Sequence, residues 1–256
     1  MSRGGKARNR MRAGLPDWVR RRLDPEQRYG LRVTLFGVAT LLVMIPFSYL
    51  LLQVTSKGPL TEMDTRVAES LYDRVRDSDL LVVAAKTVSF IGSPAWFYGT
   101  IGAAALFFLV RGQRRTSVFL AVTNLVGGAI DTVVKVLVDR PRPELVDPIV
   151  HAFGKSFPSG HTMASTVGYG SLLLAFMPLV PRRFRVPLIA GYFVLVALIA
   201  GSRLALGVHF VSDMTGGFVL GLAWLAMSTA AFSIWRIERS KPRVEVTEGV
   251  EPEAGP

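Results

Sequence analysis

Long apolar stretches, separated by short polar segments, dominate the pattern of this 256-residue chain. Several of them approach or exceed the roughly 20 residues that a helix needs to cross about 30 Å of hydrocarbon. The stretches predict membrane-spanning helices at residues 33–54, 94–110, 116–138, 161–180, 187–202 and 210–235. The expected fold class is therefore all-α, a polytopic membrane helical bundle with six transmembrane helices.

The segment between the first and second predicted spans has a different pattern. Residues 55–79 are polar and hold six acidic residues among arginines, which predicts an amphipathic surface helix. The stretch from Leu80 to Ile91 is apolar but short, and Lys86 interrupts it. This stretch suits an interfacial or re-entrant helix better than a span. We therefore expect an interfacial helix between the first and second spans.

Basic residues are concentrated on one side of this topology. The tails before residue 33 and after residue 235, with the loops at 111–115 and 182–185, hold 20 of the 30 Lys and Arg residues. The positive-inside rule assigns this side to the cytoplasm, so both termini are expected there, in a protein of the cell membrane. A net charge of +11 also raises the question of nucleic acid. Basic residues beside apolar segments are typical of membrane proteins that face anionic lipid, so no nucleic-acid partner is expected.

Three regions are expected along the chain: a basic cytoplasmic tail at 1–32, the six-span domain at 33–238, and a disordered cytoplasmic tail at 239–256. The first apolar run begins only near Val33 and has no clear small-residue cleavage site after it, so it is interpreted as a retained anchor. The chain has no cysteine, which excludes disulfides, zinc–thiolate sites and a cysteine nucleophile. The pattern carries no signal for an oligomeric state.

Three clusters of polar residues interrupt the apolar pattern. The first runs from Lys135 to Pro143 and leaves the third span, the second runs from Pro158 to His161 and enters the fourth, and the third runs from Ser202 to Asp213 between the fifth and sixth. In this topology all three lie at extracytoplasmic ends of spans. The second and third clusters are separated by two crossings, so they return to the same face and can meet.

The composition of these clusters indicates an anion site. Lys135, Arg142 and Arg203 place three cations near the membrane surface, where an uncompensated charge is costly unless it has a partner. Ser159 and the backbone amides around Gly160 lie where a helix begins, a position that favours an anion. A phosphate group is the natural partner, and these five residues are predicted to bind it.

Two histidines complete the predicted chemistry. His209 and Asp213 are four residues apart, so on a helix they share one face and the carboxylate can orient the imidazole. Such an imidazole is a good nucleophile. His161 is then free to protonate the leaving group, a contribution typically worth about 10² to 10⁴ in rate. Each motif alone also has a structural explanation, as a helix cap, a basic stop sequence or a buried hydrogen bond, and it is their combination that favours a catalytic site.

Together the clusters resemble the type 2 phosphatidic acid phosphatases, a family that shares its site with vanadium haloperoxidases. The family signature is Lys-x6-Arg-Pro, then Pro-Ser-Gly-His, then Ser-Arg-x5-His-x3-Asp. The three clusters match it in order and without a departure. The resemblance covers roughly residues 60–235.

This resemblance implies a membrane lipid phosphatase that needs no metal and no cofactor. His209 would attack phosphorus to give a phosphohistidine that water hydrolyses, and Asp213 would support His209. The residues implied to hold the phosphate are Lys135, Arg142, Ser159, Gly160, His161 and Arg203, with His161 also the general acid. The site would face the extracytoplasmic side.

The expected substrate is a lipid phosphate or diphosphate, such as undecaprenyl diphosphate, phosphatidylglycerol phosphate or phosphatidic acid. Two alternatives stay open at this point. A lipid phosphotransferase of the same fold would differ only in its acceptor, and a non-enzymatic lipid-binding or transport protein would tolerate the loss of His209.

Other polar residues receive structural interpretations. Asp131 lies one turn before Lys135, which predicts an ion pair that either positions the lysine or joins helices. Asn124 is expected to make an interhelical hydrogen bond. Arg140 and Lys155 are expected to be solvated, with attraction of anionic headgroups as the alternative role.

Overall fold

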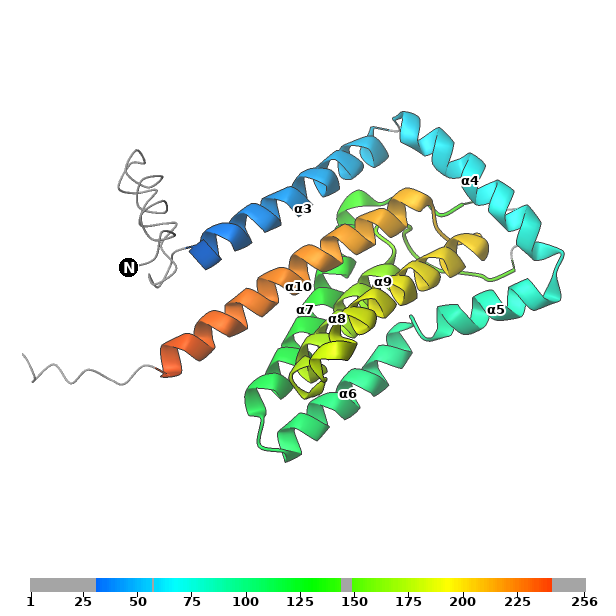
Figure 1. The fold of residues 1–256 in the computed structure, drawn as a ribbon. Coiled ribbons are helices and arrows are strands. Elements are labelled where there is room, and N and C mark those ends of the chain that lie inside the picture. Colours follow the sequence, from blue (N-terminus) through cyan, green and yellow to red (C-terminus); the bar gives the residue numbers. More distant parts are fainter. Residues whose placement is uncertain (1–30, 57, 144–148, 241–256) are drawn as a thin grey trace, which may run out of the picture.

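The computed structural model describes residues 31–56, 58–143 and 149–240, and within these ranges all regular structure is helical. The helices are α3 (Leu31–Thr55), α4 (Pro59–Arg76), α5 (Asp79–Phe90), α6 (Pro94–Val110), α7 (Arg114–Val138), α8 (Gly160–Phe176), the short 3-10 helix η1 (Met177–Leu179), α9 (Arg182–Ala205) and α10 (Val211–Ser240) (Figure 1). The all-α prediction is confirmed. Of the predicted tails, only residues 31–32 and 239–240 are described, and these are helical.

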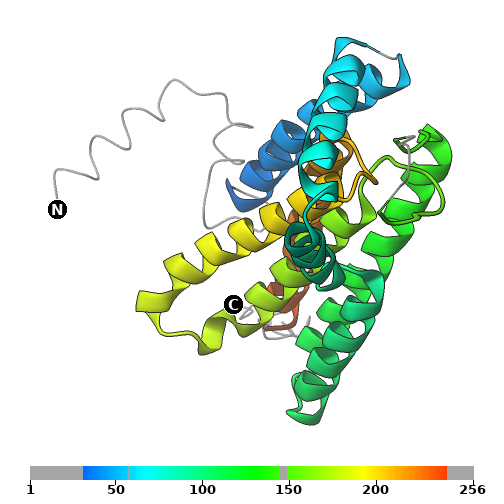
Figure 2. The ribbon, with the colours of Figure 1, turned by 90° about the vertical axis from the view of Figure 1, so that its right-hand side faces the viewer.

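Helix α8 is the centre of the bundle and contacts α6, α7, α9 and α10, while α3 packs against α10. At Gly168 of α8 a Cβ would lie 2.4 Å from the ring of Phe97 of α6, so glycine lets these two helices approach closely. The α6–α7 and α8–α9 hairpins diverge toward the end of the bundle that is far from α4 (Figure 2). The compact end, where the polar clusters lie, is therefore the end covered by α4.

Four of the described helices, α7, α8 extended by η1, α9 and α10, are long and apolar enough to cross a membrane. Helices α5 and α6 qualify together as one span that is bent by 42°. Helix α3 has 25 residues, and the part of it whose side chains are described without a gap, Val43–Thr55, is shorter than a span. The described residues thus contain four candidate spans, or five with the bent pair, and the predicted count of six is not confirmed. The 17 residues of α6 extend only about 25 Å, which is why α6 does not qualify alone.

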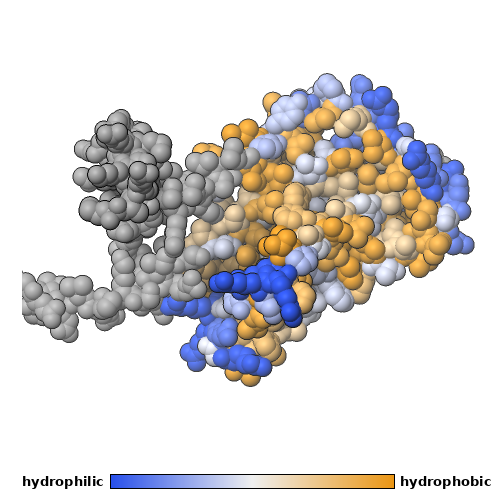
Figure 3. Space-filling view, in the orientation of Figure 1, coloured by the Kyte–Doolittle hydropathy of each residue, from blue (hydrophilic) through white to orange (hydrophobic). Residues whose placement is uncertain are grey.

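The amphipathic helix predicted between the first two spans is confirmed as α4. Its buried residues are Asp64, Ala68, Tyr72 and Val75, which recur at helical spacing along one face. Ala68 packs with Leu204 of α9 and with Phe210. Hydrophilic residues gather over α4 and, at the opposite end, near the turns before α7 and α9, with a hydrophobic surface between them (Figure 3).

Candidate active site

The three polar clusters meet at the compact end of the bundle. The Nζ of Lys135, in the last turn of α7, donates to the carbonyl oxygen of Pro158 at 2.7 Å and so joins the first cluster to the second. The amide of Ser159 donates to the carbonyl oxygen of Asp213 at 2.9 Å and joins the second cluster to the third. The three clusters therefore come together in the fold, as the number of membrane crossings between them predicted.

His209 lies in the turn between α9 and α10 and is only 2% exposed. Its Nδ1 lies 3.3 Å from Oδ2 of Asp213, and its Nε2 lies 3.1 Å from Nη1 of Arg142. A guanidinium can only donate, so Nε2 is the acceptor and Nδ1 holds the proton that faces Asp213. Burial lowers the pKa of His209 from 6.5 to about 4, although Asp213 opposes this shift. At neutral pH the imidazole is therefore neutral, with its lone pair on Nε2.

The guanidinium of Arg142 is held in place by backbone carbonyl groups from two loops. Its Nη1 donates to Val208 at 2.7 Å, its Nε to Gly154 at 3.1 Å and its Nη2 to Phe153 at 3.2 Å. Carbonyl groups orient a guanidinium without neutralising its charge. Arg142 thus presents a fixed positive charge beside His209.

The start of α8 is built for close approach. Ser159 is fully buried and acts as the N-cap, accepting from the amide of Thr162 at 3.5 Å. At Gly160 a Cβ would lie 3.1 Å from Oδ2 of Asp131 and 3.2 Å from Nζ of Lys135, so glycine lets the lysine reach the helix start. The first-turn amides of α8 have no partners within the helix itself and favour an anion there.

Arg203 and His161 complete the set of predicted site residues. Arg203 lies in the last turn of α9, is 7% exposed and donates through Nη1 to the hydroxyl of Ser89, from α5, at 2.7 Å. Within the described part of the chain its Nε has no hydrogen-bond partner, which leaves a buried donor for an anion. His161, in the first turn of α8, lies within electrostatic range of Arg203, Arg142 and His209. All eight predicted site residues are therefore at this end of the bundle.

Two predicted side-chain pairings are confirmed. Nζ of Lys135 donates to both carboxylate oxygens of Asp131 at 2.7 Å. Asn124 of α7 donates to the hydroxyl of Ser171 on α8 at 3.0 Å, which is the interhelical hydrogen bond that was expected.

The prediction for Arg140 is wrong. This residue is only 7% exposed, and its guanidinium donates to Oδ1 of Asp213 at 2.6 Å and to Oδ2 of Asp64 at 3.0 Å. Its side chain also stacks on the ring of Phe210, with 4.1 Å between the guanidinium carbon and the ring centroid. The chain folds back after α7, so Arg140 turns inward instead of toward water. Lys155, by contrast, is 45% exposed as predicted, and pairs with Asp139.

Sequence reasoning also missed Asp64, which is 2% exposed on α4. The available signal was a carboxylate in register with Ala68, Tyr72 and Val75 on the buried face of an amphipathic helix. An acidic residue in such a position needs a buried partner.

Asp213 is fully buried and accepts hydrogen bonds from several donors, as an ionised carboxylate does. Besides Arg140 and His209, these donors are the hydroxyl of Ser156 and the amide of Phe210, the latter at 2.9 Å. Among the residues that the structure describes, no group of three or more His, Asp or Glu is placed to hold a metal ion.

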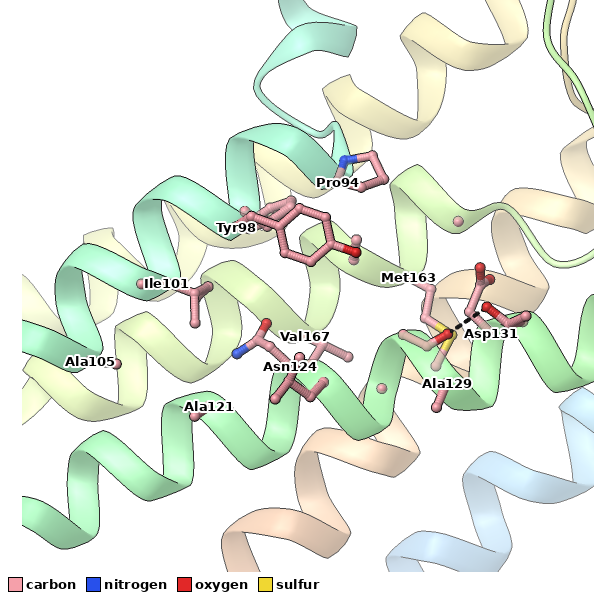
Figure 4. Close-up of a pocket in the computed structure, with 18 residues that line it drawn as sticks. Pro94, Tyr98, Ile101, Ala105, Ala121, Asn124, Ala129, Asp131, Met163 and Val167 are labelled. Atoms are coloured by element: carbon pink, nitrogen blue, oxygen red, sulfur yellow. Dashed lines mark hydrogen bonds between the residues drawn. The ribbon is translucent and has the colours of Figure 1, made fainter.

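A cavity of about 570 Å³ lies beside this site, between α6, α7 and α8. Its lining is mostly apolar, and Figure 4 shows Ile101 of α6, Asn124 of α7 and Val167 of α8 around it, with Asp131 at one end. Gly160 also borders the cavity. An apolar space therefore reaches the cluster of cations.

Comparison with known proteins agrees with this geometry. The family model described as the PAP2 superfamily matches residues 116–236, a range that contains all three polar clusters. Phosphatidylglycerophosphatase B of Bacillus subtilis (strain 168) is 35% identical over 136 residues, which cover 52% of this chain and 59% of that protein. The match thus spans about three fifths of that relative's length.

The fold has a solved counterpart. The crystal structure of a transmembrane PAP2 type phosphatidylglycerolphosphate phosphatase from Bacillus subtilis superposes with a TM-score of 0.69. It is 22% identical, and the superposition covers 80% of this chain and 98% of that one. With the four or five candidate spans, this likeness supports a multi-pass membrane protein. Over residues 116–236, which contain all three motifs, the chain is therefore similar to the PAP2 superfamily.

Proposed function

We propose that this chain is a metal-independent lipid phosphate phosphatase with His209 as its nucleophile. The observation that carries the proposal is the setting of this imidazole, with Nδ1 3.3 Å from Asp213 and Nε2 3.1 Å from Arg142. The lone pair on Nε2 points toward a fixed cation whose natural partner is an anion. A phosphate bound there would present its phosphorus to the nitrogen that attacks it.

In the first step Nε2 of His209 forms a bond to phosphorus while the bond from phosphorus to the lipid oxygen breaks. His161 donates its proton to the departing oxygen. Asp213 accepts a hydrogen bond from Nδ1–H of His209 and stabilises the positive charge that the imidazole gains. In the second step water attacks the phosphohistidine, His161 takes the proton of that water, and inorganic phosphate leaves His209 unmodified.

The transferred phosphate stays bound to the same groups during both steps. The proposed ligands are Lys135, Arg142, Arg203, Ser159 and the backbone at Gly160. Arg203 supports this role best, because its buried Nε has no partner in the described chain. Donors that are already oriented lower the barrier because they need no reorganisation as charge shifts from the nucleophile to the leaving group.

The apolar cavity supports a lipid as the carrier of this phosphate. It borders Gly160 and Asp131, so an acyl or prenyl chain there would lie next to a phosphate held at Lys135. Its volume of about 570 Å³ is that of a ligand pocket. Phosphatidylglycerol phosphate is the proposed substrate, because the 35% identical protein of Bacillus subtilis is a phosphatidylglycerophosphatase. Undecaprenyl diphosphate and phosphatidic acid are the comparison substrates.

The proposed setting is the cell membrane, with the six-span domain at 33–238 and both tails in the cytoplasm. Helices α3 and α6 then supply the two spans beyond the four that qualify by length and composition. Helix α4 and the site face the extracytoplasmic side. The basic residues at 111–115 and 182–185, where α7 and α9 begin at the other end of the bundle, support this orientation.

The test is phosphate release by detergent-purified protein from each of the three lipids, in excess chelator. His209→Ala removes the nucleophile, and His151→Ala is the matched control because His151 is exposed. We expect the fastest release from phosphatidylglycerol phosphate, a loss of at least about 10³-fold in His209→Ala, and no change in His151→Ala. Release that survives in His209→Ala, or that stops on chelation, would overturn the mechanism. Transfer of phosphate to a lipid alcohol instead of water would identify a transferase.

A further inference from the structure

A buried polar network lies behind the catalytic pair. Asp64, Arg140, Ser212 and Asp213 are 2%, 7%, 4% and 0% exposed and come from α4, the segment after α7, and α10. Burial of charged groups is costly unless they are paired and hydrogen-bonded. Here each charge faces an opposite one.

Arg140 connects the two carboxylates. Its Nη1 donates to Oδ1 of Asp213 at 2.6 Å and to the hydroxyl of Ser212 at 2.7 Å, while its Nη2 donates to Oδ2 of Asp64 at 3.0 Å. A guanidinium stays charged in proteins, so Arg140 is a permanent cation between two acids. Its positive charge is therefore shared between Asp213 and Asp64.

Asp64 also fixes the start of α10. Its Oδ1 accepts from the amide of Ser212 at 3.0 Å, and its Oδ2 accepts from the hydroxyl of the same residue. The amide of Ser212 belongs to the first turn of α10, whose amides lack partners within the helix. A carboxylate at this point favours the helix start electrostatically. Asp64 thus caps, from another helix, the element that carries Asp213.

The two oxygens of Asp213 have separate partners. Oδ1 faces Arg140, while Oδ2 faces Nδ1 of His209 and the amide of Phe210. Without Asp64, the whole positive charge of Arg140 would act on Asp213. The hydrogen bond that Asp213 accepts from the imidazole of His209 would then be weaker. If α10 lost its cap, the same carboxylate would be free to shift.

We propose that Asp64 is a positioning residue for the phosphatase reaction, an inference that rests on the proposed function. Acting through Arg140 and the start of α10, it holds Asp213 in the orientation that His209 requires. In the described chain the hydrogen bonds of Asp64 go to Arg140 and Ser212, which are neither the nucleophile nor cations of the phosphate site. Asp64 also lies outside residues 116–236, the range that matches the family model, so the three motifs do not include it.

The kinetic test compares Asp64→Asn with Glu69→Gln in the full chain, assayed with phosphatidylglycerol phosphate. Both changes remove one negative charge from α4, but Glu69 is exposed whereas Asp64 is buried. We expect Asp64→Asn to lower kcat about 10- to 100-fold, the range typical of residues that orient a catalytic group. KM should stay unchanged because the phosphate and lipid contacts are intact, Asp64→Glu should restore part of kcat, and Glu69→Gln should behave as the native chain.

A spectroscopic readout tests the same inference without turnover. The chain has three histidines, so side-chain NMR signals of ¹⁵N-histidine-labelled protein can be assigned by single substitutions. The Nδ1 proton of His209 should move upfield or broaden in Asp64→Asn, as its hydrogen bond to Asp213 weakens, and should stay in place in Glu69→Gln. A native kcat or an unmoved Nδ1 signal in Asp64→Asn overturns the proposal.

A failure of this inference can be distinguished from a failure of the proposed function and from a failure to fold. If the native chain releases no phosphate, the proposed function fails, but the NMR comparison still decides whether Asp64 controls the His209–Asp213 pair. If Asp64→Asn does not fold, Ser212→Ala replaces it, since this change removes one donor to Asp64 and keeps all charges. A smaller loss of kcat with unchanged KM is then expected, and native kinetics with an unmoved Nδ1 signal would overturn the role of Asp64.

Discussion

At the residue scale, burial and charge act on His209 in opposite directions. Removal from water lowers the pKa of the imidazole, the Asp213 carboxylate raises it, and burial prevails, with the pKa at about 4. A nucleophile must be neutral, so this shift keeps the lone pair available at physiological pH. The less basic nitrogen is intrinsically weaker, and Asp213 compensates by stabilising the charge that develops during attack.

The pKa of His209 is directly measurable in the ligand-free protein. In an NMR titration its ring signals, identified by their absence in His209→Gln, should change with a midpoint near pH 4 instead of 6.5. Between pH 6.5 and about 4 the unfolded chain binds a proton at His209 and the folded chain does not. The free energy of unfolding therefore decreases as the pH falls through this range. A midpoint at or above 6.5 would mean that Asp213 outweighs burial.

At the element scale, the site depends on how closely α10 approaches the start of α8. A Cβ at Gly217 of α10 would lie 2.6 Å from the carbonyl oxygen of Ser159 and 3.3 Å from the amide nitrogen of Met163. Backbone atoms cannot give way as a flexible side chain can. The same approach brings the amide of Ser159 to the carbonyl of Asp213.

Gly217→Ala should therefore separate the two helices. We expect a loss of about 1–3 kcal/mol in stability, as for other overpacked contacts, together with reduced phosphate release. Thermal unfolding in one detergent measures the first effect. Gly99→Ala on α6 is the control, because a Cβ there meets nothing within 4 Å and should leave the midpoint unchanged or raise it. Equal midpoints for the two variants would show that α8 and α10 have room to adjust.

The elements differ in how far the sequence could predict them. The apolar stretches predicted most ends of α7 and α10 to within a few residues. The number of membrane crossings between the three motifs predicted that they lie on one face. Arg140 could not be placed, because an Arg-Pro-Arg-Pro string is equally suited to a solvated loop and only the fold-back after α7 turns this residue inward. The contacts of Asp64 join positions up to 148 residues apart, and no local pattern encodes such a distance.

At the scale of the whole molecule, the charged and apolar residues are distributed along one axis of the bundle. Helix α4 lies at one end of the bundle and the turn between α6 and α7 at the other (Figure 1), with apolar surface between the hydrophilic ends (Figure 3). Arg111 lies in that turn, and Arg114 and Arg115 are the first residues of α7. A bilayer placed across the apolar surface would put these arginines at one interface and α4 at the other, and the positive-inside rule places the arginines in the cytoplasm.

The absence of cysteine makes this orientation testable with single substitutions. Gln113→Cys, in the turn between α6 and α7, and Glu69→Cys, on α4, replace exposed residues at opposite ends. In intact cells a membrane-impermeant maleimide should label Glu69→Cys, whereas Gln113→Cys should react only after the membrane is opened. The reverse pattern would place the site in the cytoplasm. Labelling of both positions in intact cells would put the two ends on one side and would contradict the six-span arrangement, because α6 must cross to separate them.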